Sequence, residues 1–496
     1  MIITLAFRHL LVRKLRSLFL LLGFSLGVGV MIVLLSVGEA MLEQSRDVSL
    51  VGGGEVTILP QGIDIEAMRT GGLGSMFFGI DRARFLVRQV LGGRRNGNLV
   101  ETVSPGMEGK LLYLSRAGRT VPVRAGGEIP SRAASVGSPL KLISGSWKDS
   151  PADSAYLAPT AQQLYDELDR FHLPFSPDSS WGEWHYFNLV TSAREWWYIT
   201  YLVGGEIGPN QNTQKQTERW GGQLMVTHRR ADGEYERFLM REPGSRVVLD
   251  TTRADLKIGR SSVRQRNGVY YLLGRASGAA GTVRIDLALK PEVNRYFPPV
   301  ELRADQFLSG YVVPGLIARA SGTLCVAGSC RSFADIPAYH DHNWGVWRDV
   351  TWEWGAGQGS RLAILYGGVY GPERSRATMA AIRSPFFLTL IDSLGVKQVL
   401  RFDRIHYHGA RELRGTGHFT TPERFELTAT RDADSLRLQV TVDDALGTEM
   451  KTNGFRRGFL QMRGRFTLTG TVLGSAVSDS GAGFFETYVS PPASRQ

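Results

Sequence analysis

The chain has 496 residues, enough for about three domains, and its 43% hydrophobic and 21% charged residues are typical of a globular protein rather than a disordered one. The net charge is +11, but the basic residues are spread along the chain and no nucleic-acid-binding motif accompanies them, so we expect no nucleic-acid partner. The 58 glycines and the scarcity of long helical patterns favour a mainly β fold.

The first predicted element is a helix over the uncharged residues 17–38. At 1.5 Å per residue it extends about 33 Å, enough to cross a bilayer core. Four basic residues precede it and three acidic residues follow, so the positive-inside rule places the N-terminus in the cytoplasm. A cleaved signal peptide is the alternative, because residues 38–40 form a small-x-small site. The long apolar core favours an uncleaved, single-pass anchor in residues 1–50, in a bacterial inner membrane with the main domains periplasmic.

The start of the chain resembles the opening of ABC-transporter permeases of the macrolide-exporter and lipoprotein-release type. The resemblance rests on LAFRHLLVRKLRSLFLLLGFSLGVGVMIVLLSVGEAM and the following GGGEVTILPQGIDIE. It implies a small extracytoplasmic region over residues 51–150 and ABC-transporter subunits as partners. No later segment has about 18 consecutive apolar residues, so we expect the chain to span the membrane once.

Three local patterns fill the region before residue 181. Residues 111–125 predict a hairpin that turns at Ala117 and Gly118. The glycine-rich residues 71–98 are typical of a linker or a mobile surface segment. Residues 160–170 predict the clearest helix outside the anchor.

From residue 181 onward, apolar side chains alternate with polar ones. TVRIDLAL (282–289) and LRLQVTV (436–442) are the clearest examples. Such segments, separated by short turns, predict antiparallel barrels or sandwiches. A barrel needs about eight strands, so the region is long enough for two. We place the domains at 151–330 and 331–496.

The two cysteines of the chain lie close together. Four residues separate Cys325 from Cys330, and a hairpin loop of that length would set them opposite each other. In an oxidising compartment we expect them to form a disulfide, the alternative being two unrelated small residues in a loop.

Eight of the ten tryptophans fall in two short windows. The first reads WGEWHYFNLVTSAREWWYITY and the second AYHDHNWGVWRDVTWEWG. Aromatic walls with a few convergent polar groups are typical of a site for an apolar small molecule. The alternative is a tryptophan-rich core between sheets.

The same windows resemble the carotenoid 1,2-hydratase (CrtC)/AttH-like lipocalin family. The matching segments are EWWY at 195–198 and YHDHNWG at 339–345, preceded by TAQQLYDELDRFHLPFSP and WGEWHYFN. The resemblance covers about residues 155–490. It implies two lipocalin-like antiparallel β-barrel or sandwich domains joined face to face, with a ligand pocket between or inside them and no metal or organic cofactor.

Two functions fit these residues. One is a non-catalytic carrier that binds an isoprenoid or lipid-like molecule and passes it to or from a transporter. The other is a cofactor-free hydratase or cyclase that protonates a C=C bond to a carbocation, which needs an acid in a dry, aromatic site. The first is favoured, because the family's later Tyr-x-Asp is here matched only by Tyr366-Gly367-Gly368.

Site candidates come from both windows, and we predict that they converge on one apolar pocket. As acids, water-holding groups or cation-facing groups, the catalytic candidates are Asp341, His342, Glu195 and Tyr339. The ligand-binding candidates are Trp184, His185, Trp197, Tyr198, Asn343 and Trp344.

Two pairs of histidines have a spacing that suits metal binding. His340 and His342, and again His406 and His408, would share one face of a strand. Asp341 would point the opposite way, and the family implies no metal. We therefore predict no metal site.

Overall fold

The computed structural model describes residues 14–46, 56, 58, 80–95, 97–136, 148–151, 153, 161–172, 181–207, 219–304, 307–346, 350–370, 386–413, 419–452 and 455–489. The chain divides into two compact units. One comprises Met1–Gly92 and Leu99–Ala158, and the other Gly93–Asn98 and Pro159–Gln496.

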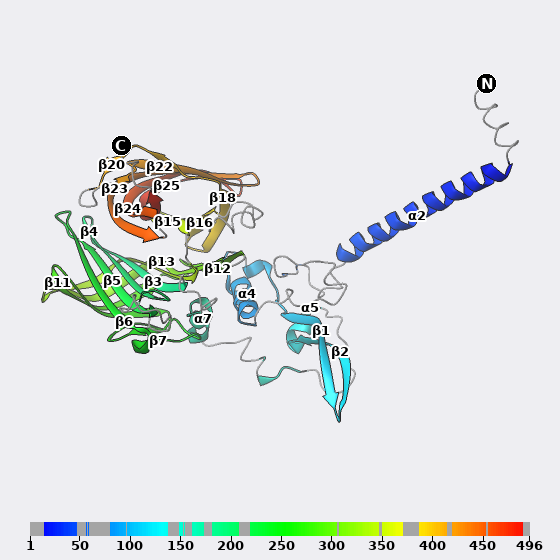
Figure 1. Cartoon of the computed structure of the whole chain (residues 1–496), viewed down its shortest axis with the longest axis horizontal. Helices are drawn as coiled ribbons and strands as arrows, with labels where there is room; N and C mark the ends of the chain where they lie inside the picture. Colours follow the sequence, from blue (N-terminus) through cyan, green and yellow to red (C-terminus); the bar gives the residue numbers. More distant parts are fainter. Residues whose placement is uncertain are drawn as a thin grey trace, which may run out of the picture. The chain divides into compact units, whose positions relative to one another are not determined.

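Within its described residues, the first unit includes the helices and the hairpin that follow (Figure 1). The helices are α2 (Lys14–Arg46), α4 (Ile80–Gly92) and α5 (Pro130–Val136), and a short 3-10 turn covers Gly97–Leu99. Strands β1 (Gly106–Arg116) and β2 (Arg119–Glu128) pair with Arg116 opposite Arg119. Ala117 and Gly118 both have positive φ, as a two-residue hairpin turn requires, so the predicted hairpin is confirmed.

Helix α4 lies where the sequence predicts a linker. Its residue Val87 is buried, together with Ile129 and the partly buried Val103. The expectation of a linker is therefore wrong for this part of residues 71–98, because the apolar side chains of α4 recur with helical period and cover one face.

Helix α2 includes the predicted membrane anchor, and its described side chains are almost all exposed. Among the residues that the structure describes, however, no helix is long and apolar enough to cross a membrane. The expected span over residues 17–38 is therefore not found.

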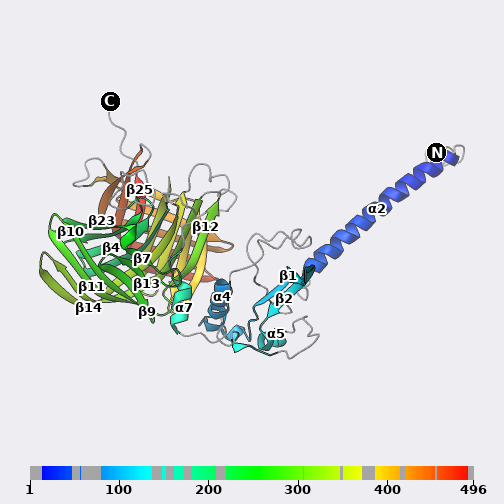
Figure 2. The ribbon, with the colours of Figure 1, turned by 60° about the horizontal axis from the view of Figure 1, so that its bottom comes forward.

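The longer part of the second unit contains helix α7 and a closed antiparallel barrel (Figures 1 and 2). Helix α7 (Ala161–Leu168) confirms the helix predicted near residues 160–170. Eight strands of the barrel pair in the order in which they are named here, and the last pairs with the first. They are β3 (Trp181–Ser192), β4 (Glu195–Gly204), β5 (Gly221–Arg229), β6 (Tyr235–Pro243), β10 (Val269–Gly278), β11 (Gly281–Pro291), β13 (Phe307–Val326) and β14 (Ser329–Val346).

Four further strands extend this sheet. Three form a path from β10, namely β9 (Ser261–Arg266), β8 (Leu256–Ile258) and β7 (Val247–Leu249), and β12 (Phe297–Ala304) pairs with β13.

A second closed barrel of eight strands follows. Its strands pair in chain order, and the last again pairs with the first. They are β15 (Thr351–Gly359), β16 (Ala363–Tyr370), β17 (Phe386–Asp392), β18 (Gly395–Phe402), β22 (Arg424–Arg431), β23 (Asp434–Thr452), β24 (Phe455–Val472) and β25 (Ser475–Val489). Short strands β19 (His406–His408), β20 (Arg411–Glu412) and β21 (Thr420–Thr421) lie between β18 and β22 in the sequence. The mainly β fold with two antiparallel barrels is therefore as the sequence predicts.

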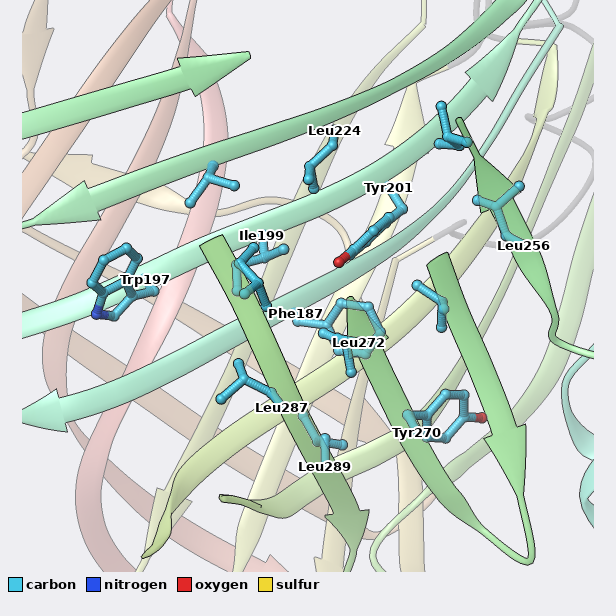
Figure 3. Close-up of a cluster of buried hydrophobic side chains, with 14 of the residues drawn as sticks. Phe187, Trp197, Ile199, Tyr201, Leu224, Leu256, Tyr270, Leu272, Leu287 and Leu289 are labelled. Carbon is cyan, nitrogen blue, oxygen red and sulfur yellow. The ribbon is translucent and has the colours of Figure 1, made fainter. Parts of the chain in front are cut away.

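Each barrel is filled by its own apolar core. The first core contains the alternating residues of β11, Val283, Ile285, Leu287 and Leu289, and surrounds Phe187 (Figure 3). The second contains the alternating residues of β23, from Leu436 to Val442. In both barrels the apolar residues that alternate along a strand are the ones that point inward, because successive side chains of a strand point to opposite sides.

The boundary between the barrels differs from the one expected near residue 330. Strand β14 pairs with β13 on one edge and with β3 on the other, and thereby closes the first barrel. Residues up to Val346 consequently belong to the first barrel, and the second begins with Thr351. The β13–β14 hairpin carries the predicted disulfide, with Cys325 and Cys330 directly opposite and their Cα atoms 4.0 Å apart.

Candidate functional site

Strand β14 presents two sets of polar side chains to two different places. His340 and His342 point into the first barrel, where the ring of His340 stacks on Phe187 with 4.2 Å between the ring centroids. Tyr339 instead belongs to a third apolar cluster that combines residues of both barrels, and its hydroxyl donates a hydrogen bond to Asp341. We call this third cluster the inter-barrel site.

The inter-barrel site is built from outward-facing side chains of both barrels. The first barrel contributes Tyr186, Trp196, Tyr198, Val313 and Tyr339, and the second Trp354, Ala356, Leu365, Phe387 and Phe484, among others. The rings of Tyr339 and Phe484 meet edge to face at 4.6 Å between centroids. At the edge of the cluster, the partly buried Trp184 and Trp352 lie 6.2 Å apart. Large aromatic surfaces of this kind suit an apolar partner.

Asp341 is the polar centre of this site. Tyr339 donates its hydroxyl hydrogen to Oδ2 at 2.7 Å, and the Asn343 amide donates to Oδ1 at 2.6 Å. Trp354 in turn donates its indole N–H to the Tyr339 hydroxyl at 3.0 Å. Burial raises the pKa of Asp341 to about 8, although these hydrogen bonds oppose the shift.

A second buried carboxyl, Glu486 of β25, faces the same site from the other barrel. It accepts hydrogen bonds from the Trp352 indole at 3.1 Å and from the Gln461 amide at 3.3 Å. Gln461 also donates to the Tyr186 hydroxyl at 3.3 Å, so a polar chain links the two barrels. Burial raises the pKa of Glu486 to about 7, so burial opposes the ionisation of both carboxyls of the site.

A separate cluster of charged residues lies inside the first barrel. Asp169, which follows α7, binds His342 through Oδ1 and the Tyr270 hydroxyl through Oδ2, both at 2.5 Å. The other ring nitrogen of His342 lies 3.0 Å from Glu183. Burial lowers the pKa of His342, but the carboxylates of Asp169 and Glu183 together outweigh that effect and raise it to about 9. Burial likewise opposes ionisation of Asp169, yet His342 and His340 hold its pKa well below the usual value.

His185 and His340 complete this barrel-interior cluster. Burial lowers the pKa of both imidazoles. Ligand atoms of Asp169, His185 and His340 all lie within 4.8 Å of one another, so within the described part of the chain these three residues could hold a metal ion. His406 and His408, the pair with the same spacing on β19, are instead exposed or half-buried.

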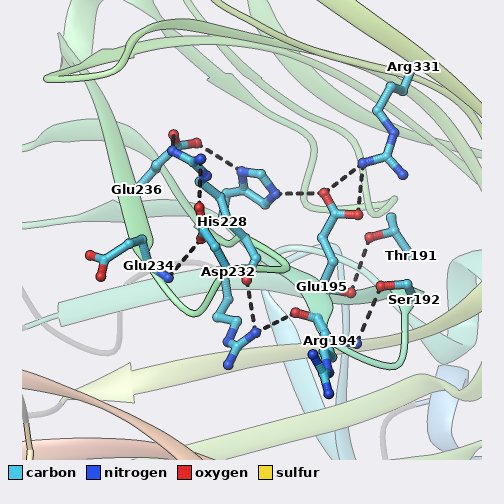
Figure 4. Close-up of polar contacts among 11 residues, drawn as sticks. Thr191, Ser192, Arg194, Glu195, His228, Asp232, Glu234, Glu236 and Arg331 are labelled. Atoms are coloured by element: carbon cyan, nitrogen blue, oxygen red, sulfur yellow. Dashed lines mark hydrogen bonds and ion pairs between the residues drawn. The ribbon is translucent and has the colours of Figure 1, made fainter.

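Glu195 occupies a third place, at the start of β4 (Figure 4). Both of its oxygens accept hydrogen bonds from Arg331 at 2.8 Å, and Oε1 lies 3.0 Å from Nε2 of His228. Burial opposes ionisation, but Arg331 and His228 lower the pKa of Glu195 below its usual value. Glu195 is therefore an ionised, paired carboxylate and not an acid. Trp197 stacks on His228, with 3.7 Å between centroids, in the core of the first barrel.

The predicted candidates consequently do not share one pocket. Asp341 of β14 is opposite Tyr186 of β3, and Tyr186 is opposite Thr200 of β4. Glu195 lies five residues from Thr200 along β4, so these two residues are roughly 17 Å apart at about 3.4 Å per residue. Tyr339, Asp341, Asn343, Tyr198 and Trp184 lie at the inter-barrel site, and His185 and His342 lie inside the barrel. Trp344 is a buried side chain stacked on His172, with 3.8 Å between ring centroids.

Three important residues escape prediction from the sequence. Asp169 follows a polar helix, and nothing in its neighbours distinguishes it from a surface residue. Glu183 stands among tryptophans in WGEWHYF, but no spacing rule connects it to His342. Glu486 carried a weak signal, because it is the single charge within the apolar segment GFFETYV.

The structures of several known proteins are similar to this chain. An AttH protein from Nitrosomonas europaea has 15% identity and a TM-score of 0.42, covering 62% of this chain and 91% of its own. Kievitone hydratase from Nectria haematococca has 15% identity and a TM-score of 0.41, with coverages of 65% and 94%. CghA with Sch210972 has 9% identity and a TM-score of 0.42, also with coverages of 65% and 94%.

This likeness concerns the fold alone. No protein-family model matches the sequence, and no curated protein does. None of these comparisons supports the resemblance of the first 150 residues to ABC-transporter permeases. At such identities and TM-scores, no residue role and no activity follows from the similarity to AttH, kievitone hydratase and CghA.

Proposed function

We propose that this chain binds an apolar, isoprenoid or lipid-like small molecule at the inter-barrel site. The observation that carries the proposal is the set of aromatic rings that both barrels bring together around two buried carboxyls, Asp341 and Glu486. The Asn188 side chain adds a polar contact, because its buried amide nitrogen has no hydrogen-bond partner among the described residues. A few polar groups within a mostly aromatic lining are typical of sites for apolar ligands.

The partly buried Trp184 and Trp352 lie at the edge of the cluster, and we propose that the ligand contacts them first. Their rings offer dispersion contacts to an extended hydrocarbon, and π-faces to any cation that forms on it. This location replaces the single pocket predicted from the sequence, which would also have included Glu195, Trp197 and Trp344.

A second candidate function is acid catalysis on the bound molecule. The raised pKa of Glu486 and its electrostatic interaction with Asp341 favour it, because buried protonated carboxyls can protonate a C=C bond. In hydration, the carboxyl proton would form a C–H bond and leave a carbocation. Water would then add to the cation and return a proton to the carboxylate. Against this stands the geometry of Asp341, which accepts hydrogen bonds from Tyr339 and Asn343, an arrangement that also suits a structural carboxylate.

Binding is tested with all-trans-retinol, whose fluorescence reports its affinity for the purified full chain. Trp354→Leu removes a ring from the inter-barrel site, and we expect the affinity to fall about tenfold, which is about 1.4 kcal/mol. The matched control is Trp197→Leu, which removes an equally buried ring from the core of the first barrel. Equal losses in the two variants, with both still folded by circular dichroism, would contradict the proposed location.

Catalysis is tested with the double variant Asp341→Asn, Glu486→Gln, which removes both buried carboxyl acids of the site. This variant should bind retinol with nearly unchanged affinity under either function. With lycopene as the substrate, an enzyme should yield a product heavier by one water molecule, and the variant should not. If the wild-type chain binds retinol but leaves lycopene unchanged, the carrier function stands and catalysis on this substrate class does not.

Anchoring and a transporter partner remain proposals based on the sequence alone. We propose that residues 17–38 hold the chain at a bacterial inner membrane with both barrels outside the cytoplasm. A carrier held there could pass its ligand to or from ABC-transporter subunits.

A further inference from the structure

We propose that Asp169, His185 and His340 bind a divalent transition-metal ion, zinc or iron(II), inside the first barrel. Two imidazoles and one carboxylate are a ligand set that both ions use in proteins. The three side chains are at most 1% exposed, and their ligand atoms lie within 4.8 Å of one another. The inference departs from the sequence-based prediction of no metal, and it is independent of the function proposed for the inter-barrel site.

The hydrogen bonds of the two histidines leave one nitrogen of each ring available. Nε2 of His185 lies 2.9 Å from the carbonyl oxygen of Ala254, and Nδ1 of His340 lies 3.1 Å from that of Tyr186. A carbonyl oxygen only accepts, so these two nitrogens carry the ring hydrogens. Nδ1 of His185 and Nε2 of His340 are buried and have no hydrogen-bond partner among the described residues. Metal-binding histidines are oriented by this kind of second hydrogen bond.

Asp169 is held beside these free nitrogens. His342 binds its Oδ1, and the Tyr270 hydroxyl binds its Oδ2. Each carboxylate oxygen has two lone pairs, so Oδ2 can accept from Tyr270 and still coordinate an ion. Oδ2 lies 3.7 Å from Nε2 of His340. Two ligand atoms of a tetrahedral site with bonds of about 2 Å are expected to lie about 3.3 Å apart, so the observed distance is close to that value.

A purely structural hydrogen-bond network explains this arrangement less well. It would leave the free nitrogens of His185 and His340 buried without partners, which is unfavourable in a barrel core. An ion would satisfy both nitrogens together with Asp169. Three protein ligands would also leave a coordination position open for water or a ligand, as in catalytic rather than structural zinc sites.

The test supplies the ion while the chain folds, because the fully buried ligands would not admit it readily afterwards. The full chain is expressed in medium supplemented with zinc and iron and purified in detergent, and its metal content is measured by mass spectrometry. We expect about one ion per chain. In parallel, the chain is refolded with Co²⁺, which should give the visible d–d absorption of a tetrahedral or five-coordinate site.

Two variants remove the ligand nitrogens but keep the bonds to the carbonyl groups. His185→Gln places an amide N–H near the position of Nε2, and His340→Asn places one near that of Nδ1. Both should lose the ion and the Co²⁺ absorption. The control is the double variant His406→Asn, His408→Asn, which removes the pair on β19 and should keep both signals.

Three results would overturn the proposal. One is a wild-type chain that binds no zinc, iron or Co²⁺ in either preparation. Another is an unchanged metal content in folded His185→Gln and His340→Asn. The third is metal that only the His406/His408 variant removes, which would identify adventitious surface binding. If the ligand variants do not fold by circular dichroism, the Co²⁺ spectrum of the wild-type chain alone decides.

Discussion

Glu486→Gln should change how the stability of the protein depends on pH. Burial raises the pKa of Glu486 from the ordinary 4.5 to about 7. Below pH 4.5 this carboxyl is protonated in both the folded and the unfolded chain, so it adds no pH dependence there. Between pH 4.5 and 7 the unfolded chain loses the proton while the folded chain retains it. The free energy of unfolding of the wild type therefore falls as the pH rises through this range.

The size of the effect follows from the shift. One pKa unit corresponds to about 1.4 kcal/mol, so a shift of this size gives a loss of about 3 kcal/mol by pH 8. Gln at position 486 does not titrate and removes this loss. Its amide can still accept from Trp352, while Gln461 turns its own amide to accept from the new N–H. Any cost of this exchange is independent of pH and cancels when the pH dependences are compared.

The assay is urea unfolding of both proteins at intervals from pH 4 to 8.5. The free energy of unfolding of the variant minus that of the wild type should rise by about 3 kcal/mol over this range. Glu412→Gln is the control, because Glu412 is exposed on β20 and its change should leave the profile unaltered. A difference that stays constant with pH would refute the reasoning, since it would mean that Glu486 is ionised at no extra cost in the folded chain.

Three further predictions follow from other parts of the molecule. Cys325→Ser should lower the free energy of unfolding by about 2 kcal/mol in oxidising buffer, where the short loop is closed, and should have little effect under reduction. Arg331→Met should lower the free energy of unfolding by only about 1 kcal/mol at neutral pH, because Arg331 is more than half exposed and Glu195 retains its contact with His228. This difference should vanish in acid, where Glu195 is protonated. If the anchor is correct, protease added to spheroplasts should digest residues 51–496, and full protection would contradict the topology.

The sequence predicts most of the strands, because a barrel strand has one face in the core and its side chains alternate. Val283, Ile285, Leu287 and Leu289 illustrate this, and all are buried. Barrel closure is different in kind. Residues 329–346 close the first barrel by pairing with a strand about 150 residues earlier, and no local pattern shows that pairing. The expected boundary near residue 330 failed for this reason.

The sequence indicates which segments meet, but not which side chains share a face. The two tryptophan windows do come together, because β14 pairs directly with β3. The predicted pocket, however, combined Asp341 with His342 and Trp344, although neighbours of opposite parity on a strand cannot share one pocket. The same alternation, applied to the histidines alone, had correctly placed Asp341 opposite to them. Asp169 and Glu486 could not be included, because each reaches its cluster only through the closure of a barrel.

Strand β14 therefore forms a wall common to both proposed sites. Asp341 faces the aromatic rings between the barrels, while its neighbours His340 and His342 face the carboxyls inside the first barrel. Successive Cα atoms are about 3.8 Å apart, so residues of the two sites are covalent neighbours on this strand. Tyr186 and His340 connect the two sites directly. The ring of Tyr186 lines the inter-barrel site, and its backbone carbonyl accepts the hydrogen bond that orients the His340 imidazole inside the barrel. An ion bound at His340 would fix that imidazole and the strand pair behind it. The geometry of the apolar site should consequently depend on whether the barrel interior is occupied.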